Sequence, residues 1–457
     1  MANNGGNKSR SNYQKSSGQR SSSQSRSRSS RSRRIEAQKR KRQKLIIRIL
    51  VIIIAVALVA TMILSVASCN RNKQPQPTAI NSGNTEAAGA GLGNDEENES
   101  EETTTEAVSS KVSLTAVGDI IAHDTILELA QTGNGYDFTS LFSPLKNDIA
   151  RMDLAIANVE TPLGGGPYTG YPSFNTPDEM GLAVINTGFD VALQASNHSM
   201  DSGTDGIRHC IDFWKQHATE TMMVGLHESQ EEADTIPIIT KNGISFAVLN
   251  YTYGLNGYEL PYDESYLITV MDDSTRDYIR NQVAQASELA DFVIVCPHWG
   301  EENQVGEPLD FQRDWANLFT EAGADLILGT HPHVIENVEW VNADNGNRAL
   351  CYYSLGNFVS NQQYTDLVLG AMAYVEIEKD ESGVHIVDGS AKAVPFVTHN
   401  DKTGDPVVIQ TYYLADYTDE LAAVHDTYLT YDGEFSVPLL KQKAQDTLGD
   451  WIIDRLP

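Results

Sequence analysis

The chain has 457 residues, a length that allows two or three domains, and a formal net charge of −29. Residues 1–48 contain 15 Lys and Arg and a single acid, Glu36, which leaves a net charge of −43 on the remainder. An acidic body repels polyanions, so no nucleic-acid partner is expected. The four cysteines form neither a CxxC pair nor a metal-ligand spacing, so no disulfide scaffold is predicted.

The N-terminal quarter of the chain predicts a tethered protein. Residues 1–48 are rich in Ser, Arg and Lys and predict a disordered cytoplasmic tail. Residues 49–68 predict a transmembrane helix, because a long uncharged apolar run matches the bilayer core, and the preceding basic cluster places the body outside the cytoplasm. The alternative is that Cys69, which follows a lipobox-like Val66-Ala67-Ser68, becomes lipid-modified. Residues 69–110 predict an acidic flexible linker.

From residue 111 the pattern changes to apolar, strand-like runs that alternate with helical segments. The expected strands cover residues 112–117, 154–157, 191–195, 246–250, 292–295, 326–328 and 350–353. The clearest expected helices cover residues 203–217 and 309–322. This alternation predicts an α/β domain over residues 111–361. Residues 362–457 contain no site motif and are assigned to the C-terminal part of the domain or an extension.

Six of the expected strands end in polar residues that can bind metals or act in catalysis. Ligand sites in open α/β sheets gather at the carboxyl ends of strands, so these residues are expected to converge. In chain order they are Asp119; Asn158 and Glu160; Asn197 and His198; His298, Trp299 and Glu301; His331 and His333; and Asn357.

The segment from Gly329 to Val334 is the most informative of these. If it is extended, His331 and His333 point to the same side, and Pro332 between them stiffens the pair. Imidazole is a ligand for zinc, manganese or iron. A surface His-Pro-His turn is the alternative, but the other polar strand ends favour a metal site.

The residue types predict a site for one or two divalent metals, with Mn, Zn or Fe as candidates. Asp119, Glu160 and Asn197 would supply oxygen ligands, and His298, His331 and His333 nitrogen ligands. A bound ion could lower the pKa of a water molecule and hold an oxyanion.

Other residues are assigned supporting roles. His298 could instead be a general acid, and Glu301 could orient an imidazole or take part in catalysis. Asn158, Trp299 and Asn357 are candidates for contact with the substrate or the ligands, although Trp299 could equally pack beside the site. Asp201 is predicted to shape the turn before the helix at 203–217.

Taken together, the motifs resemble the CapA family, which is associated with bacterial capsule and poly-γ-glutamate synthesis and related in fold to calcineurin-like metallophosphatases. The matching segments are AVGD (116–119), ANVETPL (157–163), SNHSMDSGTDGI (196–207), HWGEE (298–302), GTHPHV (329–334) and SLGNF (354–358). The resemblance implies a four-layer α-β-β-α sandwich. It also implies that Asp119, Asn197, His298, His331 and His333 are metal ligands.

By the same resemblance, His198 would be an acid that contacts the substrate. Two positions depart from the phosphatase pattern. The phosphatases have Asp-x-His on the first strand, whereas here the residue two positions after Asp119 is Ile121. Glu160 stands where a bridging Asp is expected. His123 and Asp124 could compensate for Ile121, or could be turn and helix-start residues.

The sequence therefore predicts a membrane-anchored, extracytoplasmic, metal-dependent hydrolase or transferase. Its substrate would be an amide, ester or phosphoester bond in a cell-envelope polymer such as poly-γ-glutamate. The alternative is a non-catalytic binding or assembly component of a capsule synthesis or export complex. Membrane proteins of capsule synthesis are the expected partners.

Overall fold

The computed structural model describes residues 110–404, 406–431 and 434–457. The predicted tail and transmembrane helix, and all but the last residue of the predicted linker, lie outside these ranges. Within them, no helix is both long enough and apolar enough to span a bilayer.

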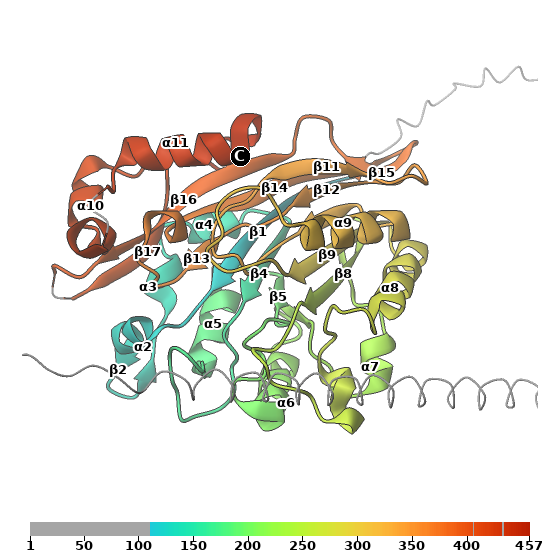
Figure 1. Ribbon diagram of the computed structural model, residues 1–457, viewed down its shortest axis with the longest axis horizontal. Helices are drawn as coiled ribbons and strands as arrows, with labels where there is room; N and C mark the ends of the chain where they lie inside the picture. Colours follow the sequence, from blue (N-terminus) through green and yellow to red (C-terminus); the bar gives the residue numbers. More distant parts are fainter. Residues whose placement is uncertain (1–109, 405, 432–433) are drawn as a thin grey trace, which may run out of the picture. The chain divides into compact units, whose positions relative to one another are not determined.

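Two large β-sheets form the centre of the described part of the chain (Figure 1). The first has nine described strands: seven follow the order β17-β16-β14-β1-β4-β5-β6, β13 pairs with β1, and β15 pairs with β14. Their bounds are β1 Ser110–Ile120, β4 Leu154–Val159, β5 Val191–Leu193, β6 Met222–Val224, β13 Asn357–Val359, β14 Leu369–Asp380, β15 Gly383–Ile386, β16 Lys392–Asp401 and β17 Val408–Tyr413.

The second sheet has six described strands in the order β11-β12-β10-β9-β8-β7. Their bounds are β7 Ile238–Lys241, β8 Ile244–Thr252, β9 Phe292–His298, β10 Leu326–Leu328, β11 Val338–Asn342 and β12 Arg348–Tyr352. A separate small ribbon consists of β2 Gln131–Thr132 and β3 Gly135–Tyr136.

Parallel pairing brings the polar strand ends to one edge of each sheet. In the first sheet β1, β4 and β5 are parallel, and in the second sheet β8, β9, β10 and β12 are parallel. Every residue of β9 is buried, which explains its continuous apolar sequence, because such strands are covered on both faces.

The helices cover the outer faces of the two sheets. Side chains of α5 (Asp178–Thr187) and α6 (Gly203–Gln216) pack on the first sheet, and those of α8 (Arg276–Leu289) and α9 (Asp310–Ala322) pack on the second. A third core cluster joins the two sheets, with Leu114 and Ile156 on one side and Phe246 and Ile294 on the other. The fold is therefore mixed α/β, as predicted, and its layers are helix, sheet, sheet and helix.

The remaining described helices are short or C-terminal. They are α2 Asp124–Ala130, α3 Thr139–Phe142, α4 Lys146–Ile149, α7 Gln230–Asp234, α10 Asp419–Val424 and α11 Val437–Leu448, with 3₁₀ turns at Tyr262–Leu267, Thr365–Leu367 and Gly449–Trp451 and a π-helical turn at Thr427–Tyr431.

The C-terminal part of the chain completes the first sheet. β14 pairs antiparallel with β1 along seven residue pairs, and β16 and β17 extend the sheet beyond it. Helix α11 lies along β16, where Leu440 and Ala444 join the same core cluster as Ala393 and Val397 (Figure 1). Residues beyond 361 thus form part of the framework that holds β1 and its terminal Asp119.

A candidate metal centre at the ends of the strands

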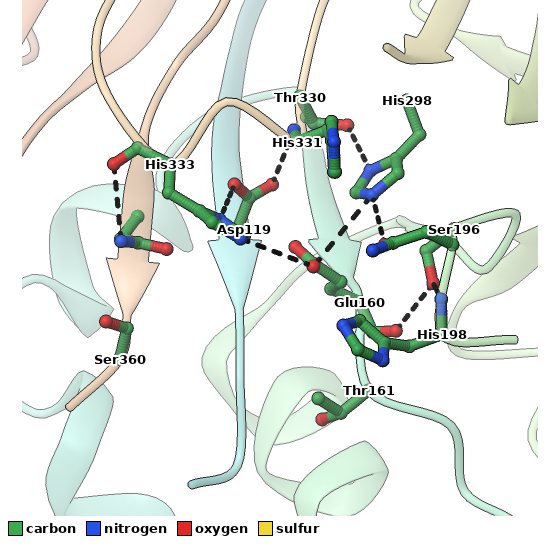
Figure 2. A network of polar contacts seen from close by, with 12 residues as sticks. Asp119, Glu160, Thr161, Ser196, His198, His298, Thr330, His331, His333 and Ser360 are labelled. Atoms are coloured by element: carbon green, nitrogen blue, oxygen red, sulfur yellow. Dashed lines mark hydrogen bonds and ion pairs between the residues drawn. The ribbon is translucent and has the colours of Figure 1, made fainter. Parts of the chain in front are cut away.

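The polar strand ends of the two sheets meet in one buried cluster, shown in Figure 2. Asp119 lies near the end of β1, Glu160 directly after β4, and His298 at the last position of β9, while His331 and His333 follow β10. These five side chains are at most 3 % exposed. The structure therefore brings together residues that are up to 214 positions apart.

His331 and His333 converge through a tight turn and not through an extended strand, so the predicted backbone geometry was wrong. Their φ angles are 99° and 62°, in the left-handed region that residues other than glycine rarely adopt. The ring centroids lie 5.8 Å apart. Strained backbone of this kind persists where the surroundings fix it and is common at functional sites.

Glu160 occupies the centre of the cluster. Its carboxylate belongs to two groups whose ligand atoms lie within 4.8 Å of one another: one with His331 and His333, the other with Asp119 and His298. Neither of its oxygens has a hydrogen-bond partner among the described residues. Burial, and then the charge of Asp119, raise the pKa of Glu160 well above its usual range. A cation would stabilise this carboxylate in its charged form.

The imidazoles of His298 and His331 are held neutral. Burial is the largest cause that lowers the pKa of each well below its usual value of 6.5, and the neighbouring histidines lower it further. His331 Nδ1 is buried and has no hydrogen-bond partner in the described chain. Neutral imidazole is the form that binds metals, so these rings are suited to be ligands.

The spacing of the donor atoms also fits a divalent ion. His298 Nε2 lies 2.9 Å from Asn197 Oδ1, and His333 Nδ1 lies 2.9 Å from Asp119 Oδ2. Ligand atoms about 2.1 Å from one ion and at right angles to each other are roughly 3 Å apart, so both pairs match neighbouring ligands. With Glu160 between them, these residues would hold one or two ions.

Thr330 fixes the orientation of His298, a role that the sequence did not indicate. Its Oγ1 lies 3.0 Å from His298 Nδ1 on the side opposite Asn197. Residues that hydrogen-bond the far nitrogen of a histidine ligand determine its tautomer and the direction of its free lone pair. Such hydroxyl contacts have no sequence signature.

His198 is oriented by Asp201, which was predicted only to shape the following turn. His198 Nδ1 lies 2.7 Å from Asp201 Oδ2, and the same oxygen accepts a hydrogen bond of 2.7 Å from the backbone N–H of Phe174. The Phe174 ring packs edge-on against the imidazole, with centroids 4.7 Å apart. Asp201, three residues along the chain, and Phe174, from the segment before α5, thus fix the ring of His198.

Asn256 is a further residue that sequence reasoning missed. Its Oδ1 accepts a hydrogen bond of 3.1 Å from Asn197 Nδ2, and its Nδ2 lies 3.1 Å from His198 Nδ1. Asn256 has φ 48° and precedes Gly257 in an Asn-Gly turn. That dipeptide marks a turn but gives no hint that the turn reaches the site.

Two predicted site residues do not belong to the cluster. Glu301 is exposed, and no described contact joins it to an imidazole. The side chains that orient the imidazoles are instead Asp201, at His198, and Thr330, at His298. Trp299 is fully buried, stacks with Phe319 and donates from Nε1 to the Tyr353 carbonyl. Its environment agrees with the packing alternative and leaves no surface for a substrate.

The predicted supporting asparagines hold the framework. Asn158 Nδ2 donates to Asp119 Oδ1 at 2.8 Å. Asn357 Nδ2 lies within hydrogen-bond distance of the His333 carbonyl, at 3.3 Å, and of the Leu367 carbonyl, at 2.9 Å. Both residues are fully buried, so they position Asp119 and the turn at His333 and do not face a substrate.

Ile121 and His123 show how the chain departs from the Asp-x-His pattern. Ile121 is buried and provides no ligand atom. His123 immediately precedes α2, and its Nδ1 accepts a hydrogen bond from the Asn361 N–H at 3.2 Å. Burial, followed by the charge of His333, lowers the pKa of His123 to about 4. His123 is thus a helix-start residue close to the cluster, and the groups formed around Glu160 do not include it.

Two glycines of the motifs allow neighbouring backbone segments within each sheet to approach closely. A Cβ at Gly118 would lie 1.9 Å from the Gly356 carbonyl oxygen, and one at Gly329 would lie 2.0 Å from the Tyr353 carbonyl oxygen. No side chain fits at such distances. The backbone segments therefore pass very close to each other at both positions.

The fold resembles solved structures of distant sequence. A calcineurin-like phosphoesterase from Bacillus subtilis is 13% identical, with a TM-score of 0.36 over 63% of this chain and 91% of its own. A Thermus thermophilus sulfate thiohydrolase is 12% identical, with a TM-score of 0.32 over 71% of this chain and 48% of its own. These likenesses are too distant to transfer any activity.

Comparisons with relatives and with a family model give the assignment. A capsule biosynthesis protein CapA of Bacillus anthracis is 28% identical over 64% of this chain and 73% of its own length. A PGA biosynthesis protein CapA of Bacillus subtilis is 32% identical, but the match spans only 43% of this chain and 49% of that relative. The model described as bacterial capsule synthesis protein PGA_cap matches residues 113–362, which include every residue of the cluster. The chain therefore belongs to the PGA_cap family of bacterial capsule synthesis proteins.

Proposed function

We propose that this protein is a metal-dependent hydrolase or transferase that acts in capsule synthesis on a cell-envelope polymer such as poly-γ-glutamate. The scissile bond would be an amide, ester or phosphoester. Residues 49–68, or a lipid on Cys69, would tether the protein to the outer face of the cell membrane, next to membrane proteins of capsule synthesis.

The observation that supports an enzyme best is the arrangement around Glu160. A buried carboxylate without a hydrogen-bond partner lies 3.9 Å from His298 Nε2 and 3.8 Å from His333 Nε2. Two ring nitrogens thus lie near the carboxylate, and burial favours the neutral imidazole at His298. One or two divalent ions bound there would polarise a scissile group and lower the pKa of a bound water molecule.

His198 is the group placed to transfer a proton. Its side chain is 10% exposed, more than those of the residues around Glu160, so it lies at the edge of the cluster that a substrate can reach. Asp201 holds Nδ1, which leaves Nε2 to donate a proton to a leaving group or to take one from a nucleophile. Asn197 and Asn256, next to it, can donate hydrogen bonds to an oxyanion.

A second candidate function is non-catalytic, namely the binding of a polymer or the assembly of a capsule complex. The observation in its favour is the degree of enclosure, because Asp119, Glu160 and His298 are each at most 1 % exposed. The acidic body opposes a polyanionic polymer in either function, so within the non-catalytic class it favours assembly over polymer binding.

The test is turnover by the full-length protein with Mn, Zn or Fe added, on phosphoester, ester, amide and γ-glutamyl substrates. His198→Ala should abolish turnover and leave the melting temperature within a few degrees of wild type. His385→Ala is the matched control, because His385 is exposed in the β14–β15 hairpin and should behave as wild type. A protein that binds metal but turns over none of these substrates would favour the non-catalytic role.

A further inference from the structure

A cavity of about 650 Å³ lies beside the loop that follows β8. The loop at 254–260, the 3₁₀ turn at Tyr262–Leu267, the segment at 268–275 and side chains from α7 and α8 form its walls. The volume lies within the range of small-molecule sites in proteins. No residue of the metal cluster lines it.

The cavity and the metal cluster share the loop after β8. Gly254, Leu255 and Gly257 line the cavity, whereas Asn256, between them, hydrogen-bonds Asn197 and contacts His198. Consecutive Cα atoms are only about 3.8 Å apart, so the loop is a thin common wall. Tyr253, at the start of the loop, packs on His331 with ring centroids 4.5 Å apart. The loop thus places the cavity directly next to the metal cluster.

The lining of the cavity combines tyrosines and hydrogen-bonding side chains with aliphatic residues, among them Leu255, Leu260, Ile268 and Val270, and none of the described lining residues is cationic. Lys, Arg and His are absent from the described residues that line it. Tyr258, Tyr266 and Tyr278 offer ring faces, and the uncharged polar side chains are Gln230, Ser265, Thr269 and Thr275. A carboxylate-bearing polymer unit would find no positive partner there and would face the carboxylates of Glu259 and Asp272.

The two carboxylates do not make the cavity a cation site. Asp272 Oδ1 already accepts hydrogen bonds from the backbone N–H of Ser274 at 2.7 Å, from the Ser274 hydroxyl at 2.6 Å and from the Thr275 N–H at 3.1 Å. These donors stabilise its charge. Glu259 is exposed, so water solvates it. Both carboxylates can accept hydrogen bonds from ligand hydroxyls, while the tyrosine rings can pack on the apolar face of a sugar.

We propose that this cavity is a subsite for a neutral saccharide segment of the polymer whose bond lies at the metal cluster. The proposal rests on the proposed function, because it takes the bond at the metal cluster to be the one that reacts. Binding of the sugar in the cavity itself requires neither metal nor turnover. It narrows the substrate class of the proposed function to cell-envelope polymers that carry a neutral sugar next to the scissile bond, which poly-γ-glutamate alone does not. Because Asn256 belongs to the shared loop and contacts His198, a ligand in the cavity that moves this loop would also shift the contact with His198.

The test is to measure by calorimetry the binding of three trisaccharides to the full-length protein in the presence of a metal chelator. The probes are the neutral N-acetylglucosamine trimer, the cationic glucosamine trimer and the anionic galacturonic acid trimer. We expect the neutral trimer to bind and the anionic trimer not to bind. Tyr258→Ala should weaken binding of the neutral trimer about tenfold by removing a stacking face.

Tyr262→Ala is the matched control, because Tyr262 is 97% exposed in the same segment and does not line the cavity. It should leave the affinity unchanged, and a melting curve for each variant shows that both are folded. The proposal is overturned if the cationic or anionic trimer binds best, if none binds, or if the two tyrosine variants behave alike. Because the assay contains no metal, its outcome is independent of whether the cluster is an active metal centre.

Discussion

Asp201 Oδ2 is a shared acceptor for two distant parts of the chain, the imidazole of His198 at 2.7 Å and the backbone N–H of Phe174 at 2.7 Å. This one oxygen joins the loop before α5 to the turn before α6. The charge of Asp201 therefore acts on His198, while its shape also holds the loop at Phe174. A substitution that keeps the shape separates the two roles.

Asp201→Asn should lower turnover with little loss of stability. The amide can keep a contact with one partner but stabilises an imidazolium poorly, so we expect kcat to fall by on the order of 10²-fold. Asp205→Asn, an exposed position in the first turn of α6, is the control and should change neither turnover nor stability. Unchanged kcat in Asp201→Asn would remove His198 from catalysis.

Glu160→Gln should have opposite effects with and without metal. Burial and the charge of Asp119 raise the pKa of Glu160, so its ionised form is unfavourable in the metal-free protein, and the uncharged amide should raise the free energy of unfolding by on the order of 1 kcal/mol. The same change removes the central carboxylate and with it the stabilisation by added metal. Melting curves in chelator and in Mn or Zn measure both effects. Metal that stabilises the variant as much as wild type would contradict the central role of Glu160.

Gly118→Ala should destabilise the fold strongly. The added Cβ would lie 1.9 Å from the Gly356 carbonyl oxygen, which is backbone and cannot rotate away, so we expect a loss of about 3 kcal/mol or more. Gly133→Ala is the matched control, because a Cβ there meets nothing within 4 Å. Chemical denaturation of both variants gives the comparison. Equal stability of the two variants would show that the backbone at Gly356 does not approach Gly118 this closely.

The stability of the C-terminal region should fall in mild acid. His399 and His425 are buried with ring centroids 5.5 Å apart, and burial lowers the pKa of each to about 4. Asp401 and Asp426 oppose this shift, whereas Lys402 adds to it at His425. In the unfolded chain both histidines bind protons near pH 6.5, whereas in the folded protein they do so only near pH 4. Their contribution to the free energy of unfolding is therefore fully present above pH 6.5 and is lost as the pH falls toward 4. Between pH 7 and pH 5 the loss is about 2 kcal/mol for each histidine.

Denaturation curves at pH 7 and pH 5 test this expectation. His425→Gln should reduce the loss between the two pH values by about 2 kcal/mol, because glutamine does not titrate and can still donate to the Thr398 carbonyl. His217→Gln, at the end of α6 and away from this pair, should leave the pH dependence unchanged. The same pH dependence in all three proteins would show that the pair at 399 and 425 is not its source.

The strand ends could be predicted from the sequence because each is a local signal. The strand at residues 326–328 was predicted with its observed bounds, and Asp119, Glu160, His298, His331 and His333 converge as expected. An apolar run followed by a polar residue suffices to predict each strand end. Parallel pairing of the strands then brings these ends to the same edge of the sheet.

The partners of these residues could not be predicted, because they depend on contacts between distant segments. Thr330, Asp201 and Asn256 are ordinary turn residues in the sequence, and only the fold brings their side chains to the imidazoles. The positive φ of His331 arises from packing that a local pattern does not encode. β16 was missed because Pro395 and the buried polar residues Thr398, His399 and Asn400 interrupt its apolar sequence.

The most direct test of the metal centre is the metal content of the full-length protein, measured by mass spectrometry after loading with Mn, Zn or Fe and removal of the excess. The comparison is the double variant His331→Ala/His333→Ala, with His385→Ala as the control. We predict one or two equivalents of metal in wild type and in the control, and a loss of at least half of it in the double variant. Wild type that retains no metal, or a double variant that retains all of it, would contradict the assignment of Asp119, Glu160, His298, His331 and His333 as a metal site.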